Sequence, residues 1–119
     1  MRNSYVLFAL QLFSYYLMED SSDFEVRLTT YLLTSFIDAN KSEQYFLKDE
    51  LLDGYELFDD YGKRIKAYLG IGLSEKELDI AISEVNQRDL IQIKGGKSKT
   101  LLVKLNLNYI KDATKEIYP

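Results

Sequence analysis

The pattern of hydrophobic and polar positions along the chain predicts a mainly α domain with a small β-hairpin. Residues 5–18 are apolar on nearly every side, which is typical of a helix that is buried on more than one face. Further apolar positions recur at helical spacing. They predict helices over 23–38, 45–52, 61–69 and 75–88, and a short C-terminal helix over 108–117.

Two of these helices begin at a capping box, in which a serine and a glutamate three residues later satisfy each other's exposed backbone amides. The pairs are Ser22 with Glu25 and Ser74 with Glu77. They predict that the helices start at residues 23 and 75. The Asp53-Gly54 turn is expected to end the helix over 45–52.

The stretch 93–100, IKGGKSKT, allows two interpretations. A phosphate-binding loop would need a glycine five residues before Gly96, but Ile91 stands there, and no helix start follows. The apolar and β-branched runs on either side, 90–94 and 100–107, are typical of two strands. With Gly95-Gly96 between them, they predict a β-hairpin.

Residues 63–106 have the order of a short helix, a glycine-containing turn, a capped helix and a hairpin. The characteristic residues of this stretch are Leu69-Gly70, Leu73-Ser74, Glu77-Leu78, Ala81-Ile82, Val85, Arg88 and Leu90-Ile91. In this order and at these positions, the C-terminal half of the chain resembles winged helix-turn-helix domains. The chain departs from the pattern in two extra turn residues, Ile71-Gly72, and in Asp89, which stands where glycine is usual.

This resemblance implies a single domain in three parts. An acidic helical part (1–60) would precede the winged helix-turn-helix core (61–107), and a C-terminal helix (108–119) would follow it. Such domains place the second helix of the motif in the major groove of DNA and the hairpin, or wing, on the flanking backbone. The chain would then be a transcriptional regulator or a replication-initiation protein that needs no cofactor or metal.

The resemblance also implies which residues would touch double-stranded DNA. The groove-facing positions of the helix 75–88 would be Lys76, Asp79, Ile80, Ser83, Asn86 and Gln87. The amides of Asn86 and Gln87 are suited to pair with adenine. Phosphates would be contacted by Lys94, Lys97, Lys99 and Lys104 of the wing and by Lys63, Arg64 and Lys66 of the preceding helix.

Charge is distributed unevenly, and it leaves a second function open. Residues 1–62 carry twelve acidic and four basic side chains, whereas residues 63–119 carry eleven basic and seven acidic ones. The helix 75–88 is itself acidic, because four carboxylates outnumber Lys76 and Arg88. Carboxylates near phosphates oppose DNA binding. The alternative is a non-catalytic protein–protein interaction module or adaptor subunit of a larger complex.

Composition narrows the remaining chemistry. The chain has no cysteine and no histidine, which excludes disulfides, thiol nucleophiles and Cys/His zinc sites and agrees with a cytoplasmic location. The acidic stretch 49–60 lacks the D-x-D-x-D-G spacing of a calcium loop, so a solvated acidic face is the simpler interpretation. We therefore expect no enzymatic activity.

The apolar N-terminal stretch 5–18 is too short to span a bilayer, which needs about 20 residues. Glu19-Asp20 follow it in place of the small residues of a signal-peptide cleavage site. It predicts either a central core helix or the contact of a homodimer. A third possibility is that the chain is the N-terminal piece of a longer protein such as a replication initiator.

Overall fold

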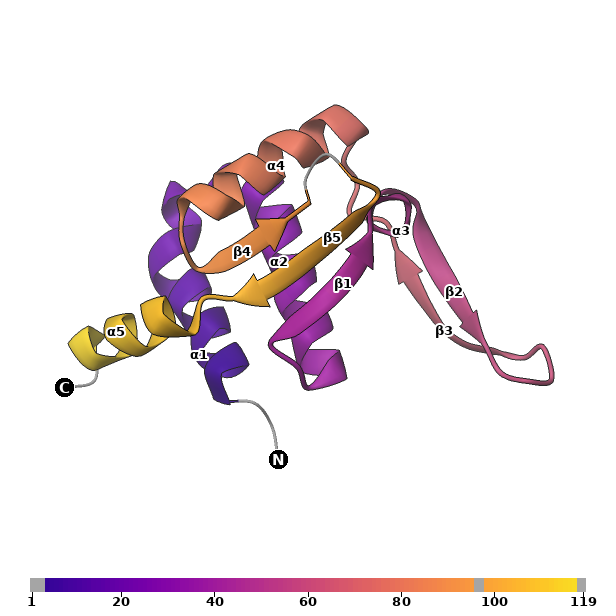
Figure 1. Cartoon of the computed structure of the whole chain (residues 1–119), viewed down its shortest axis with the longest axis horizontal. Coiled ribbons are helices and arrows are strands. Elements are labelled where there is room, and N and C mark those ends of the chain that lie inside the picture. Colours follow the sequence, from indigo (N-terminus) through magenta and orange to yellow (C-terminus); the bar gives the residue numbers. More distant parts are fainter. Residues whose placement is uncertain (1–3, 96–97, 118–119) are drawn as a thin grey trace.

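A computed structural model describes residues 4–95 and 98–117 and shows a mixed fold of helices and small antiparallel sheets (Figure 1). The helices are α1 (Ser4–Leu12), α2 (Asp23–Ala39), α3 (Lys48–Asp53), α4 (Glu75–Gln87) and α5 (Leu107–Ile117). The strands are β1 (Glu43–Leu47), β2 (Gly54–Phe58), β3 (Arg64–Leu69), β4 (Ile91–Lys94) and β5 (Thr100–Leu105). After α1, a π-helical turn (Phe13–Leu17) and a 3₁₀ turn (Met18–Asp20) lead towards α2.

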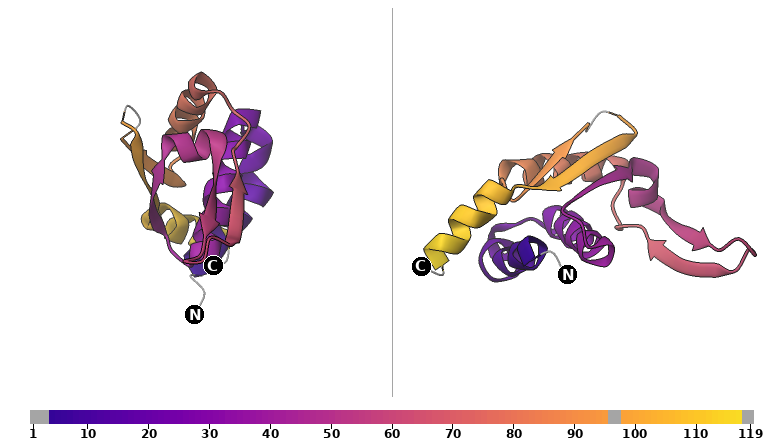
Figure 2. Two further views of the ribbon diagram at one scale, coloured as in Figure 1. Left: turned by 90° about the vertical axis from the view of Figure 1, so that its right-hand side faces the viewer. Right: turned by 60° about the horizontal axis from the view of Figure 1, so that its bottom comes forward.

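The expected hairpin over 90–107 is confirmed. Strands β4 and β5 pair in antiparallel fashion, with Ile93 opposite Val103. Strand β1 pairs with the other edge of β5, with Tyr45 opposite Leu102, so the sheet has the order β1-β5-β4. One face of this sheet packs on the helices, and its other face is open to solvent (Figures 1 and 2).

The hydrophobic core lies between this sheet and the helices α1, α2 and α4. Leu101, Val103 and Leu105 of β5 are buried there because alternate residues of a strand share one face. The helices contribute Phe36 from α2 and Leu78 from α4, both fully buried. Helix α1 adds Val6, Ala9 and Leu12 to the same core, and the π-helical turn after it adds Phe13. The most apolar face of α1 is therefore buried against other parts of the same chain.

One expected helix is wrong, and another begins later than expected. The helix expected over 45–52 is present from Lys48 as α3 and ends at Asp53-Gly54 as expected, but the residues up to Leu47 form strand β1. The segment 61–69 is strand β3 from Arg64 to Leu69. This strand pairs with β2, and Leu69 lies opposite Gly54 at the base of the pair. Helix-forming residues in both segments gave a local pattern that pairing with a partner strand overrides.

Strands β2 and β3 and the turn between them, residues 54–69, project from the body; we call them the arm (Figures 1 and 2). The two ends of the arm lie next to each other at the body. Gly54 pairs with Leu69 there, and the amide of Ile71 donates to the carbonyl of Leu51 at 2.9 Å. At its far end, the Asp59 carboxylate accepts hydrogen bonds from the amides of Tyr61 and Lys63, which fixes the turn.

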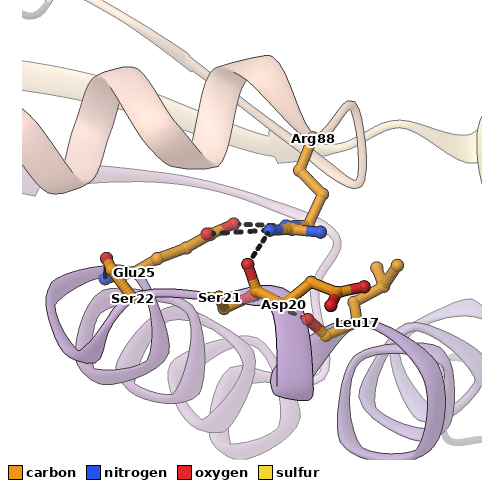
Figure 3. A network of polar contacts seen from close by, with 6 residues as sticks. All are labelled: Leu17, Asp20, Ser21, Ser22, Glu25 and Arg88. Atoms are coloured by element: carbon orange, nitrogen blue, oxygen red, sulfur yellow. Dashed lines mark hydrogen bonds and ion pairs between the residues drawn. The ribbon is translucent and has the colours of Figure 1, made fainter.

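A buried ion pair joins the start of α2 to the end of α4 (Figure 3). The Arg88 guanidinium donates to both carboxylate oxygens of Glu25, whose side chain is 3% exposed, and to the carbonyl of Asp20 at 3.1 Å. Hydrogen bonding to Glu25 raises the pKa of Arg88 above its ordinary value. The capping box expected at Ser22 is therefore only half formed. Ser22 Oγ accepts from the Glu25 amide, but the Glu25 carboxylate is turned to Arg88.

Removing the arginine should leave a carboxylate buried without a partner. We expect Arg88→Ala to lower the free energy of unfolding by about 3–5 kcal/mol, measured by urea denaturation. The matched control is Arg64→Ala, whose ion pair with Glu56 is exposed on both sides and should contribute at most about 1 kcal/mol. Equal losses from the two variants would contradict this role for Arg88.

Asp89 has the left-handed φ of +65°, immediately after the C-cap Arg88 of α4. Glycine adopts this conformation without strain, which explains why glycine is usual at this position of the winged-helix pattern. We expect Asp89→Gly to raise the free energy of unfolding by about 0.5 kcal/mol, and Asp89→Val to lower it by about 1–2 kcal/mol. Thermal denaturation of the two variants should therefore shift the midpoint in opposite directions.

Candidate nucleic-acid interface

Helix α4 presents the face that the sequence predicted for it. Its capping box is complete, with the Ser74 amide donating to Glu77 Oε1 at 2.9 Å and the Glu77 amide donating to Ser74 Oγ at 3.2 Å. Leu78, Ala81, Ile82 and Val85 are buried on the body side. The expected groove-facing residues are all exposed: Lys76, Asp79, Ile80, Ser83, Asn86 and Gln87.

Asn86 has a structural role that the sequence did not indicate. Its amide nitrogen donates to the carbonyl of Ile93 at 3.0 Å, and its amide oxygen accepts from the Ile93 backbone amide at 2.7 Å. The side chain thus ties the end of α4 to strand β4. A bidentate contact with adenine needs the same two atoms, so we remove Asn86 from the candidate base-reading residues and keep Gln87.

The acidity of α4 is partly neutralised within the chain. Glu77 is engaged in the capping box. Lys48, the first residue of α3, forms an ion pair with Asp79 at 2.9 Å. Glu75 lies in the first turn of α4, where a negative charge interacts favourably with the helix dipole. Among the four carboxylates of α4, the ion pair with Lys48 offsets the charge of Asp79, whereas Arg88 at the end of the helix is itself paired with Glu25.

The wing carries part of the expected lysine cluster at its open end. Lys94 ends β4 and Lys99 precedes β5, and both side chains are exposed. Ser98 closes the turn, because its amide donates to the carbonyl of Gly95 at 2.8 Å. Gly96 and Lys97 lie outside the described residues. Lys104 is half-buried near the end of β5, between Glu43 of β1 and Gln92 of β4, so it belongs to the sheet face and not to the tip.

The expected cations Lys63, Arg64 and Lys66 lie on the arm and not at the start of a helix next to α4. Arg64 is paired with Glu56 at 3.4 Å. Lys66 donates to Asp38 at 3.1 Å and lies 4.8 Å from the centre of the Tyr68 ring. Interactions with Tyr68 first, and then with Asp38, raise the pKa of Lys66. These residues therefore do not extend the surface of α4.

A cavity of about 610 Å³ that was not expected from the sequence lies at the base of the arm. We call it the tyrosine cleft; its lining includes Tyr31, Tyr55 and Tyr68 and the carboxylates of Asp38, Glu43 and Glu50. Tyr55 and Tyr68 face each other across the arm with ring centres 4.7 Å apart. Burial, and then the neighbouring tyrosines and Glu50, raise the pKa of Tyr31.

A signal for this feature was present in the sequence. Tyr55, Leu57 and the run 64–69 flank the turn-forming stretch Asp59–Gly62, which is the order of a hairpin. Recognising it would have placed Tyr55 opposite Tyr68.

Within the described residues, no group of three or more metal-ligating side chains is placed to hold a metal ion. Over the same residues, none of the helices has the length and apolar character needed to span a membrane. No protein-family model, no curated protein and no solved structure matches the chain.

The role of Asn86 can be tested in the absence of any ligand. Asn86→Ala should lower the free energy of unfolding by about 1–3 kcal/mol, because the backbone groups of Ile93 lose two hydrogen bonds. Hydrogen exchange at the Ile93 amide should accelerate in the same variant. Gln87→Ala, one position on, serves as the control and should leave both quantities nearly unchanged.

Proposed function

We propose that the chain is a winged helix-turn-helix domain that binds double-stranded DNA. The order of elements along the chain supports this proposal: α3, a connection at residues 70–74, the capped helix α4 and the β4–β5 hairpin occur in that order. The first helix of the motif would then be α3 in place of the segment 61–69. The arm would be an insertion between the two helices, closed at its base where Gly54 pairs with Leu69.

One observation carries the proposal. The exposed side of α4 bears Lys76, Ser83 and Gln87, and the open end of the wing bears Lys94 and Lys99. Helix α4 and strand β4 of this hairpin lie next to each other in the fold (Figure 1). Polar residues on a helix beside a cationic hairpin match the division between base contacts and phosphate contacts. The pairing of Lys48 with Asp79 removes one charge that would repel phosphates.

The decisive experiment is a titration of labelled random duplex DNA at low salt. A domain of this kind should bind it with a dissociation constant of about 100 μM or tighter. Lys94→Ala and Lys99→Ala should each weaken binding to every sequence and lower the salt slope by about one unit.

Two variants give this titration its controls. Lys115→Ala removes an exposed lysine in the last turn of α5, away from α4 (Figure 1), and should not change the affinity. Gln87→Ala should leave the salt slope unchanged and relax preference at one base pair, by about 1–3 kcal/mol. Absence of detectable binding at low salt would refute the proposal.

One observation favours the alternative of a protein-binding module. Ile80 is exposed in the middle of the same face of α4, beside Glu84 on the next turn, so the face is apolar at its centre. An apolar centre with a charged rim is typical of protein interfaces. If the chain does not bind DNA, Ile80→Glu and the charge reversal Glu84→Lys should each abolish binding of the protein partner. Asp79 is unsuitable for that test because reversing it also breaks the pair with Lys48.

A further inference from the structure

Strand β1 has one open edge. Among the strands that the structure describes, β5 alone pairs with it. The backbone pairs just beyond the two ends of this ladder are both hydrogen-bonded, namely Ser42 with Leu105 at 2.9 Å and Lys48 with Lys99 at 2.8 Å. Because bonded pairs alternate along antiparallel strands, Gln44 and Phe46 also bond to β5. The backbone amides of Glu43, Tyr45 and Leu47 therefore point to the open edge.

The tyrosine cleft runs along this open edge. Four consecutive residues of β1, from Glu43 to Phe46, line it. Successive side chains of a strand point to opposite faces, so a cavity that touches all four lies along the edge and not over one face. Tyr31 of α2 and Tyr55 and Tyr68 of the arm line the other walls. The volume of about 610 Å³ lies within the range of about 300–1,000 Å³ that ligand pockets have.

We propose that the tyrosine cleft binds an extended peptide segment of another protein, which adds to β1 as a fourth strand and places an arginine or lysine side chain among the tyrosines. An exposed strand edge presents a row of amide and carbonyl groups that such a segment can satisfy in register. Alternate side chains of the added strand share the face of Phe46, whose ring packs against Phe36 of α2. Those side chains point towards α2 and into the cleft.

The lining of the cleft selects a basic side chain. Lys66 of the arm already lies 4.8 Å from the centre of the Tyr68 ring and donates to Asp38, as ammonium groups do at aromatic faces beside a carboxylate. Glu50 of α3 is half-buried and forms no ion pair within the described residues. Burial first, and then Tyr68 and Glu50, raise the pKa of Tyr55. The negative charge of Glu50 therefore acts on the same wall of tyrosines.

The other charges of the lining leave the carboxylate of α3 as the one for a cation from outside. Asp38 is paired with Lys66, and Glu43 lies opposite Lys104 on β5. Lys41 also lines the cleft, but its side chain is exposed. Salt screens an exposed charge more strongly than a half-buried one. The lysine therefore offsets the buried part of the cleft only in part.

Strand β1 of a second copy would not supply this ligand. Its sequence, EQYFL, contains one carboxylate and no basic residue. Two such edges would bring like charges together, which opposes pairing. The cleft therefore fits a strand of different composition, with a basic residue among residues that favour extended structure.

Hydrogen exchange with a synthetic peptide tests the strand addition. The probe is the heptapeptide Thr-Val-Arg-Val-Arg-Val-Thr. The amide of Tyr45 should exchange rapidly in the chain alone, and about tenfold or more slowly with the peptide bound. The amides of Gln44 and Phe46, already bonded to β5, should be protected in both states. Unchanged exchange of Tyr45 at about 1 mM peptide, or a protected Tyr45 amide in the chain alone, would overturn the proposal.

Changes in the peptide separate strand addition from simple attraction between charges. Replacing both arginines with citrulline keeps their shape but removes their charge, and should weaken binding about tenfold. The amides of a strand point alternately to its two edges, so methylating those of alternate residues blocks one edge at a time. One of the two methylated peptides should lose binding and the other should keep it. Equal affinities of the two would contradict the addition of a strand.

Variants of the chain test its side of the contact. Tyr45→Pro removes an outward amide without removing a bond to β5, and proline is tolerated in edge strands. It should abolish binding of the arginine peptide, whereas the matched control Tyr45→Thr should retain most of it. Circular dichroism should show both variants folded. Equal binding by the two would refute the role of the edge, and a dimer of the chain that Tyr45→Pro dissociates would assign the edge to a second copy.

The charge of the cleft is tested separately. Glu50→Gln should weaken binding of the arginine peptide about tenfold and leave binding of the citrulline peptide unchanged. The control is Glu116→Gln in α5, which lies at the end of the molecule away from the arm (Figure 1) and should change neither. Equal effects of the two substitutions would show general attraction to an acidic protein and overturn the proposed site. None of these experiments involves DNA, so this proposal can fail or succeed independently of the proposed function.

Discussion

The ion pair between Glu25 and Arg88 is the constraint on which the position of α4 depends. It joins Glu25, in the first turn of α2, to Arg88, the C-cap of α4, and these residues are 63 positions apart in the sequence. A buried pair tolerates little movement, since separating its charges would leave a carboxylate desolvated without a partner. Asp89 then turns the chain into β4 directly after this anchor. The exposed face of α4 and the wing therefore keep a defined relation to each other.

The parts of the structure that local signals encode could be predicted from the sequence. The capping box at Ser74 and Glu77 and the apolar spacing of α4 both lie within the helix they specify. The β4–β5 hairpin is likewise encoded by two apolar runs and a glycine turn. Because the buried face of α4 followed from this spacing, its exposed residues followed as well. This local information was enough to predict one side of the candidate site.

The errors arose where a distant partner decides the outcome. Lys66 and Ala67 favour a helix in isolation, but the arm forms because β2 offers their segment a strand partner. Glu25 matched a capping box, but Arg88 competes for its carboxylate from far along the sequence. The ion pair between Lys48 and Asp79 also joins residues far apart in the sequence, so the sequence does not reveal that this carboxylate of α4 is paired. Counting charges along a chain differs from knowing which charges remain unpaired in the fold.

The pairing of β1 with β5 has a consequence for how the molecule is built. Glu43 is matched with Lys104, so α3, the arm, α4 and β4 all intervene between two adjacent strands. Closing so long a loop costs conformational entropy before any contact between the two strands offsets that cost. Folds rich in such long-range contacts form slowly. The hairpins β2–β3 and β4–β5 are local and can form within microseconds. During synthesis on a ribosome, the edge of β1 that pairs with β5 therefore stays unpaired until residue 105 has emerged. Throughout this time that edge is exposed to pairing with strands of other chains.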